Sequence, residues 1–425
     1  MISKRDIEYK LKPNNELWKY LEGKRNGFKT RKTPNYVPYR TNENYSPKIL
    51  LIFPPITIPR GAMKRCVPPI GLCYIAAQLQ KEGFRVSILD AVVEGYDREV
   101  VSQDGSLITY GLRPTDIRER IEDKKPDIIG ISTIFSTDLK SLYRVAQIAK
   151  EWNSRVPVVV GGLHPTIYPR EVLLGAVQGD IRTIDFIIRG EGEKRMPRFL
   201  KDLINKRIDL NADGLCGWHT GEIFINPELE RIEDIDSLPF PAYELLPIEK
   251  YFDINVPFSP VPKGNRVLPV LTSRGCPIGC NFCASTNMYR IYIARSAANV
   301  IDEIIELKKK YNIDEIQFVD DNLTLDRQRA TELFTRMQNL ALAWCTPNGT
   351  MINTLDEEII DLMYKAGLYQ ITFSIDSTNT KTLRHYHKKS VKTNIIPGLV
   401  NKTNALGIFS HGTLVVGMPG ETMED

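Results

Sequence analysis

The chain has 425 residues, of which 42% are hydrophobic and 25% charged, and its formal net charge is +4. These values are typical of an ordinary globular protein with room for two or three domains, and they give no support for a nucleic-acid partner. No apolar run reaches the ~18 residues of a membrane span, and the opening MISKRDIEYK lacks the apolar core of a signal peptide. The seven cysteines do not resemble a secreted disulfide framework, so we interpret the protein as cytoplasmic.

Residues 1–46 are interpreted as a basic N-terminal arm. Lysines and arginines are frequent in its first 35 residues. A charge run of this kind is usually a solvated, frayed segment, and we favour that interpretation over contact with RNA or a membrane.

Residues 47–207 alternate short apolar runs with helix-length amphipathic stretches. The runs are KILLIF (48–53), FRVSILD (84–90), DIIGIS (127–132), VPVVVGG (156–162) and DFIIRG (185–190). Continuous apolar strands between helices predict a parallel sheet covered on both faces. We therefore expect a Rossmann-like, doubly wound α/β domain.

Two further segments follow this domain. Residues 208–262 are rich in proline and poor in periodic pattern, which predicts a linker. A second βα series occupies 263–425, and repeats of this length indicate a partial (β/α)6 barrel, in which sites gather at the carboxyl ends of the strands. Because an open barrel leaves an unpaired apolar edge, we expect the barrel to be incomplete and the chain to be truncated at its C-terminus.

The stretch RGCPIGCNFCAST (274–286) places Cys276, Cys280 and Cys283 in the loop after the first barrel strand. A disulfide pair with a spare thiol is one interpretation, and structural zinc is another. Structural zinc usually takes four protein ligands, and no second pair of closely spaced cysteines is present. A four-iron cluster held by three thiolates would leave one iron open to a further ligand.

The spacing Cys-x3-Cys-x2-Cys, with Phe282 just before the last cysteine, resembles the signature of radical S-adenosylmethionine enzymes. The resemblance implies a [4Fe–4S] cluster on Cys276, Cys280 and Cys283, whose open iron binds S-adenosylmethionine. It further implies that one electron from the cluster cleaves this molecule and that the resulting deoxyadenosyl radical takes hydrogen from an unactivated carbon.

The same resemblance assigns the S-adenosylmethionine contacts to the ends of later strands. They are Phe282, Asp320, Asp321, Ser374, Asp376, Lys388, Gly417 and Glu421. Three of these assignments have simpler alternatives. The Asp pair could cap the helix before Arg327, Asp376 could be a buried capping residue, and Lys388 could belong to a solvated basic face.

The first domain lacks the G-x-G-x-x-G loop of a dinucleotide site, yet its strand ends carry small and polar residues. These candidates for ligand contact are Ser132, Thr133, Thr137, Gly161, Gly162, His164, Gly190 and Glu191. In an open α/β sheet such positions border one crevice, so a ligand is expected there.

These segments, in this order, resemble the cobalamin-binding domain that precedes the radical barrel in one branch of the superfamily. The Asp-x-His-x-x-Gly motif that supplies a histidine to cobalt is absent. The resemblance therefore implies cobalamin without a protein imidazole, with His164 as a wall residue. The alternative is a degenerate Rossmann fold that binds nothing or binds only a partner.

We predict a cobalamin-dependent radical enzyme that transfers a methyl group to an unactivated carbon of a small molecule. It would need a reducing partner such as flavodoxin or ferredoxin, with no nucleic acid and no membrane involved. Radical cyclisation, rearrangement or oxidation without methyl transfer is the first alternative. A non-enzymatic iron–sulfur redox sensor is the second.

Overall fold

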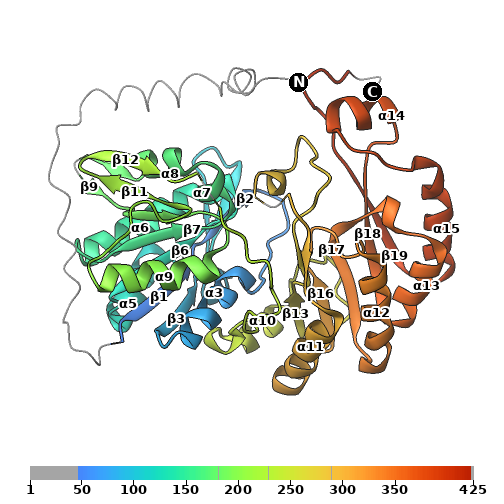
Figure 1. Cartoon of the computed structure of the whole chain (residues 1–425), viewed down its shortest axis with the longest axis horizontal. Coiled ribbons are helices and arrows are strands. Elements are labelled where there is room, and N and C mark those ends of the chain that lie inside the picture. The colour runs from blue at the N-terminus through green and yellow to red at the C-terminus, as the bar shows by residue number, and fades with distance from the viewer. Residues whose placement is uncertain (1–45, 180, 228, 289, 423–425) are drawn as a thin grey trace.

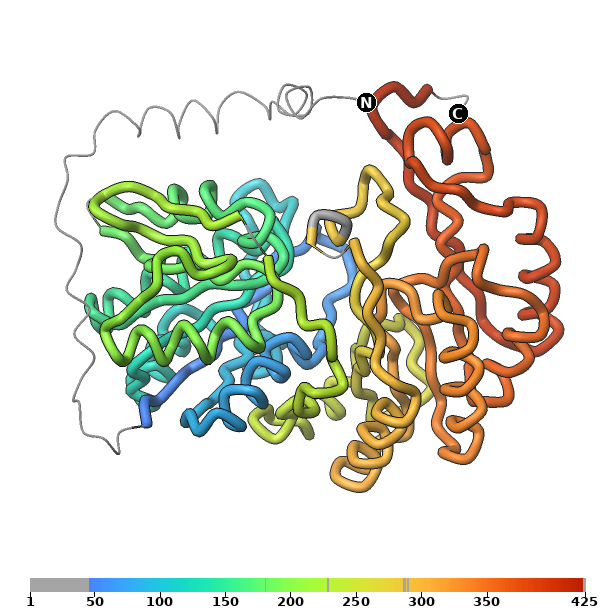
Figure 2. The backbone as a smooth tube through the Cα atoms, in the orientation of Figure 1, coloured from blue at the N-terminus to red at the C-terminus, as the bar shows by residue number. Residues whose placement is uncertain are grey.

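The computed structural model describes residues 46–422 except 180, 228 and 289. Two α/β units lie side by side (Figure 1), and the chain passes from the first to the second through the yellow-green segment in Figure 2. The predicted N-terminal arm lies outside the described residues.

The first unit is built on a seven-stranded sheet with the order β12-β11-β10-β7-β6-β1-β3. Its strands are β1 (Lys48–Phe53), β3 (Arg85–Asp90), β6 (Ile128–Ser132), β7 (Val158–Gly161), β10 (Phe186–Ile188), β11 (Leu215–His219) and β12 (Glu222–Ile225). The first five in sequence pair in parallel, whereas β11 and β12 add an antiparallel ribbon. The sheet thus continues past Arg207, into the segment that the sequence assigned to the linker, and the predicted domain limits stay predictions. From here on, the linker means residues 226–262, which follow β12.

Helices cover both faces of this sheet. They are α3 (Ile70–Lys81), α4 (Ala91–Glu94), α5 (Pro114–Lys124), α6 (Leu139–Trp152), α7 (Leu163–Ile167), α8 (Pro169–Gly175) and α9 (Gly192–Ile204). Side chains alternate along β1: Ile49 and Leu51 belong to the apolar cluster that includes α3 and α9, while Leu50 and Ile52 belong to the one that includes α5 and α6. A strand buried on both faces needs this continuous apolar run. Small antiparallel pieces, β2 (Ile56–Pro59), β4 (Glu99–Val101), β5 (Leu107–Tyr110), β8 (Val177–Gln178) and β9 (Ile181–Arg182), lie outside the main sheet.

The second unit has five parallel strands in sequential order, β13-β16-β17-β18-β19. They are β13 (Val267–Val270), β16 (Glu315–Phe318), β17 (Ala343–Met351), β18 (Leu368–Asp376) and β19 (Phe409–Leu414). The main helices are α11 (Ala297–Tyr311), α12 (Arg327–Met337), α13 (Glu357–Lys365) and α15 (Ile396–Ala405), which Figure 1 shows along the outer side of the strands. The predicted class, a doubly wound α/β domain followed by a parallel βα barrel domain, is confirmed.

Local sequence explains where the barrel helices begin. Ser296, Asp326 and Asp356 precede α11, α12 and α13, and each side chain accepts a hydrogen bond from a backbone N–H in the first turn. Such caps satisfy amide groups that have no partner inside the helix. They also fix where each loop from a strand end joins its helix.

The core is continuous between the two units. One apolar cluster contains residues of α3, of the linker and of the barrel strands. Linker helix α10 (Ile248–Ile254) lies in this region, and the hydroxyl of linker residue Tyr243 donates to the backbone oxygen of Pro269 in β13 at 2.7 Å. None of the helices in the described part of the chain combines the length and apolar character that a membrane crossing needs.

Candidate active site

The three clustered cysteines lie in one loop, residues 275–292, named here the cysteine loop. Its ends pair as the short antiparallel strands β14 (Ser273–Arg274) and β15 (Ile293–Ala294). None of the chain's seven cysteines forms a disulfide. The structure thus contradicts the interpretation as a disulfide pair with a spare thiol.

Cys276, Cys280 and Cys283 are partly buried, and Cys276 and Cys280 lie close to the ammonium of Lys389. Burial raises the pKa of Cys276 and raises that of Cys280 to about 11, while the ammonium of Lys389 opposes both shifts. A neighbouring cation favours the thiolate, which is the form that binds metal.

No three His, Cys, Asp or Glu side chains of the described residues converge on a position for a single metal ion. A four-iron cluster places different thiolates on different irons, so its ligands need not meet at one point. Three partly buried thiols on one loop, with a cation close by, are a donor set that fits such a cluster.

The two acids after β16 face different surroundings. Asp320 is buried, and its carboxylate accepts hydrogen bonds from the hydroxyl of Thr272 (2.7 Å), from the N–H of Thr272 (3.1 Å) and from the hydroxyl of Ser273. Asp321 is exposed and accepts from the Ser285 hydroxyl at 3.3 Å, close to Cys276. Asp320 therefore holds the first two barrel strand ends together, and Asp321 is the acid that faces the cysteine loop.

Asp376, at the end of β18, pairs with a lysine that the sequence prediction missed. The ammonium of Lys389 contacts the Asp376 carboxylate and donates to the backbone oxygen of Ser374 at 3.1 Å, and both charged side chains are buried. Asp376 has a φ of 64°, a left-handed backbone conformation that few residues other than glycine adopt.

The predicted Lys388 is exposed. It takes a left-handed conformation (φ 52°) at the end of the π-helix Leu383–His387, and the chain turns there. The turn directs the next residue, Lys389, into the barrel. Lys389 is therefore the buried base beside Cys276 and Cys280, whereas Lys388 is exposed at the surface.

His387 joins the cysteine loop to the motif after β19. Phe282 meets the His387 ring edge-on, with centroids 5.3 Å apart, and Nε2 lies 3.3 Å from a carboxylate oxygen of Glu421. The N–H of Asn281 donates to the backbone oxygen of His387 at 3.1 Å. Gly417 begins the same motif with a φ of 84° and open space around it. Phe282 and Glu421, predicted separately, thus meet through a histidine that sequence reasoning missed.

In the first unit, the parallel strand order reverses between β1 and β6, so a crevice is expected at their carboxyl ends. Ser132, Gly161, Gly162 and Gly190 line one pocket there, together with Leu51, Gly130 and other apolar residues. A Cβ on Gly162 would lie 2.1 Å from the backbone oxygen of Thr133, so only glycine allows this approach.

The other crevice candidates lie outside that pocket. Thr133 is buried and its hydroxyl has no hydrogen-bond partner, whereas Thr137 is exposed. His164 is buried, and its Nδ1 lies 2.9 Å from the Ser136 hydroxyl; burial lowers the pKa of its imidazole. The role of His164 as a wall residue stays a prediction.

Glu191 is held by contacts within the protein. One carboxylate oxygen accepts from the guanidinium of Arg274 and the other from the N–H of Ile232, both at 2.7 Å. Arg274 stands two residues before Cys276, and helix α7 contacts the turn Ala284–Asn287 of the cysteine loop. The crevice of the first unit and the cysteine loop therefore adjoin one another.

Comparisons with known proteins agree with this arrangement. Residues 56–200 match the family model of the B12 binding domain, and residues 270–425 match that of the radical SAM superfamily. Cytidylyl-2-hydroxyethylphosphonate methyltransferase of Streptomyces wedmorensis is 34% identical over 408 residues, covering 89% of this chain and 75% of the relative. Anaerobic magnesium-protoporphyrin IX monomethyl ester cyclase of Rubrivivax gelatinosus is 28% identical over 372 residues, covering 84% of this chain and 60% of the relative.

A solved structure shares the fold. The radical S-adenosylmethionine methyltransferase TsrM of Kitasatospora setae, determined with cobalamin and a [4Fe–4S] cluster bound, aligns with a TM-score of 0.68 at 18% identity. The alignment covers 89% of this chain and 68% of that one.

Proposed function

The chain belongs to the radical S-adenosylmethionine superfamily, with a B12-binding domain ahead of its radical domain, and from this premise we propose that it methylates an unactivated carbon of a small molecule. The observation that carries the proposal is the 34% identity to a methyltransferase along 89% of the chain. The contact between the crevice and the cysteine loop supports it, because both cofactors must reach one substrate.

Cys276, Cys280 and Cys283 would hold the cluster, and the glycine-lined pocket of the first unit would receive part of the cobalamin. When bound, the cluster would supply the electron that cleaves S-adenosylmethionine to a deoxyadenosyl radical, and cobalamin would supply a methyl group that it takes from a second S-adenosylmethionine. The chain's own residues position these groups and keep water from the radical.

Three groups of the barrel would orient S-adenosylmethionine. The exposed carboxylate of Asp321 is suited to its ammonium, and the buried Lys389, paired with Asp376, supplies positive charge for its carboxylate. Glu421 and Phe282, both in contact with His387, would form the wall on the side of Gly417. These roles are proposals that rest on position and charge.

The crevice would hold cobalamin without a protein ligand to cobalt. His164 is not among the residues that line the glycine-lined pocket, and Gly161, Gly162 and Gly190 contribute no side chains to its wall. The buried hydroxyl of Thr133, which has no partner, is a donor that an amide of the ligand could satisfy. Electrons would come from a small reducing protein such as flavodoxin or ferredoxin in the cytoplasm.

A radical cyclisation is the second candidate, because a cyclase is 28% identical over 372 residues. Both candidates consume S-adenosylmethionine, but only methylation moves its methyl group into the product. Product analysis therefore separates them.

The test is anaerobic purification with iron, sulfide and cobalamin supplied, followed by reduction with S-adenosylmethionine labelled in its methyl carbon. We expect spectra of both cofactors, formation of 5′-deoxyadenosine, and label in a small-molecule product from a panel of candidates. Full cluster loading without 5′-deoxyadenosine would favour the redox sensor. Formation of 5′-deoxyadenosine with an unlabelled cyclised product would favour the cyclase.

A further inference from the structure

The base of the cysteine loop is attached to both units of the protein. Strands β14 and β15 close the loop. Arg274 is the last residue of β14, and Arg295 directly follows β15. The two arginines have different partners. Their contacts decide how the cysteines are placed relative to the first unit.

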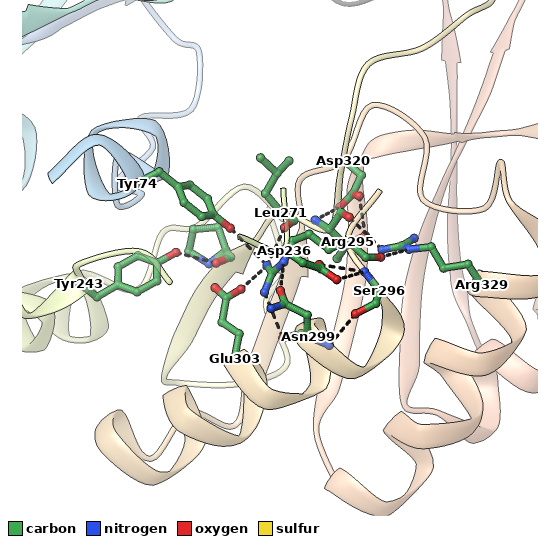
Figure 3. A network of polar contacts seen from close by, with 12 residues as sticks. Tyr74, Asp236, Tyr243, Leu271, Arg295, Ser296, Asn299, Glu303, Asp320 and Arg329 are labelled. Carbon is green, nitrogen blue, oxygen red and sulfur yellow. Dashed lines mark hydrogen bonds and ion pairs between the residues drawn. The ribbon is translucent and has the colours of Figure 1, made fainter. Parts of the chain in front are cut away.

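Arg295 anchors the base to the barrel (Figure 3). Its guanidinium contacts the carboxylate of Glu303, donates to the side-chain oxygen of Asn299 at 2.6 Å and donates to the backbone oxygen of Leu271 at 3.0 Å. Arg329 donates to the backbone oxygens of Arg295 and, at 2.9 Å, of Thr272. This side of the base is thus held by buried groups of the barrel.

Arg274 anchors the base to the first unit. Its two terminal nitrogens donate to two different carboxylates, those of Glu191 and Glu193, each at 2.7 Å. The side chains of all three residues are 10% exposed or less. Breaking one partner of a buried ion pair leaves an unpaired charge, which makes this attachment costly to lose.

Tyr74 of α3 connects the two anchors. Its hydroxyl accepts from Arg295 at 3.2 Å, and the Arg274 guanidinium carbon lies 5.5 Å from its ring centroid. Helix α9, which starts at Gly192, packs on α3; a Cβ on Gly192 would lie 2.9 Å from a methyl carbon of Ile75. The glycine therefore allows a close approach of the two helices, and Glu193 in the first turn of α9 lies near Tyr74.

Each partner of the ion pair is close in sequence to one of the two sites. Glu191 directly follows Gly190, which lines the pocket of the first unit, and Arg274 precedes Cys276 by two residues. A displacement of the pocket wall would thus be carried to the cysteines through one rigid contact. A guanidinium is suited to this, because its planar fork fixes direction as well as distance.

We propose that Arg274 is a positioning residue, which through Glu191 and Glu193 sets the distance between the first-unit pocket and the cysteine loop. The proposal rests on the proposed function, since a fixed distance between two cofactor sites matters when both act on one substrate carbon. Arg274 itself touches neither cofactor in this account. It sets the mean distance between the two sites and limits how much that distance varies.

The first test is hydrogen exchange of the full chain without cofactors, in Arg274→Gln and Arg274→Lys. We expect amides of the cysteine loop to exchange at least about tenfold faster in Arg274→Gln, because the contact that ties the base of the loop to the first unit is lost. Arg274→Lys keeps the charge but not the two-pronged geometry, so its increase is smaller. Arg327→Gln is the matched control, since Arg327 also joins two carboxylates, Asp356 and Glu358, but within the barrel and at the surface.

The second test measures the separation of the two cofactors in the loaded enzyme, from the dipolar coupling between paramagnetic cobalt and the reduced cluster. We expect a narrow distance distribution in the unmodified protein and in Arg327→Gln, a broad one in Arg274→Gln, and partial recovery in Arg274→Lys. Equal exchange in Arg274→Gln and Arg327→Gln, or an unchanged distribution, overturns the proposal. If Arg274→Gln fails to fold, Arg274→Lys decides by the same criteria. Failure of cobalamin to bind refutes the proposed function instead, and leaves the exchange result standing.

Discussion

At the carboxyl ends of the barrel strands, charged side chains fill the candidate site, whereas the corresponding edge of the first sheet offers a pocket lined by glycines. The barrel site contains three thiols, the acid Asp321 and the buried pair of Asp376 and Lys389. The pocket contains Gly161, Gly162 and Gly190 beside apolar side chains.

This difference corresponds to two kinds of binding. A cluster and a zwitterion need specific ligands and opposite charges, so removing one side chain should abolish binding. A large flat cofactor needs room and shape, so adding a side chain should block it. Two kinds of substitution therefore test this difference. One kind removes a side chain from the barrel site, and the other adds a side chain to the pocket.

The largest effect is expected from Cys280→Ala. Loss of one of three thiolates should lower iron content and reduce 5′-deoxyadenosine formation by at least about 100-fold, while cobalamin binding stays unchanged. Cys345→Ala is the control, because this thiol is fully buried in β17, away from the loop. Iron analysis and product quantification check both. Equal iron loss in the two variants would show that the loop is not the cluster site.

Lys389→Met is expected to have the next largest effect. It leaves the buried carboxylate of Asp376 unpaired, which should cost about 3–5 kcal/mol of unfolding free energy and weaken S-adenosylmethionine binding. Chemical denaturation and equilibrium binding measure the two effects. Adding Asp376→Asn should restore part of the stability but not the binding.

The exposed Lys388 provides the control for this experiment. Lys388→Met should change the unfolding free energy by no more than about 0.5 kcal/mol. If Lys388→Met weakens S-adenosylmethionine binding more than Lys389→Met does, Lys388 is the residue that binds it, as the sequence predicted.

Gly161→Leu should produce a smaller effect that is confined to the first unit. A Cβ at this position makes only ordinary contact, 3.5 Å from the backbone oxygen of Ile188, so the fold tolerates a side chain that then fills the pocket. We expect cobalamin affinity to fall about 10- to 100-fold, in line with the loss of well-packed contacts, with cluster loading unchanged. Gly398→Leu, at an exposed helical glycine of α15 with open space, is the control. Unaltered cobalamin affinity in Gly161→Leu would place the cofactor elsewhere.

The sequence was sufficient to predict the class of both units and the position of the cysteine loop, because apolar periodicity and cysteine spacing are local. It named Lys388 rather than Lys389, because no local pattern shows that a left-handed residue after a π-helix turns the second of two adjacent lysines inward; the role of Lys388 stays a prediction. It could not separate Asp320 from Asp321, since their difference lies in contacts with Thr272 and Ser285, which are distant in sequence. The role of Glu191 depends on Arg274, 83 residues away, and no local pattern reports such a partner.

The last prediction concerns how the linker is attached to the first unit. Burial raises the pKa of Asp90 to about 7, although hydrogen bonds from the Tyr251 hydroxyl and from the N–H groups of Val92 and Val93 favour its ionised form, and Glu94 adds to the rise. Since the folded protein holds this proton more tightly than the unfolded chain, stability is greatest below pH 3.8 for this group and falls as pH rises through about 7.

One such group contributes at most about 1.4 kcal/mol per pH unit. Asp90→Asn keeps the side-chain oxygen that caps α4 and should remove this part of the pH dependence. Denaturation at several pH values between 4 and 7 measures it, with Asp104→Asn as the control, because Asp104 is an exposed carboxylate whose pKa is lowered to about 2 and which stays ionised throughout this range. A slope that is the same in Asp90→Asn and in the unmodified protein would mean that the carboxyl is ionised in the folded state. The contact between Tyr251 and Asp90 would then be a charged attachment of the linker, similar in kind to the ion pairs of the barrel site.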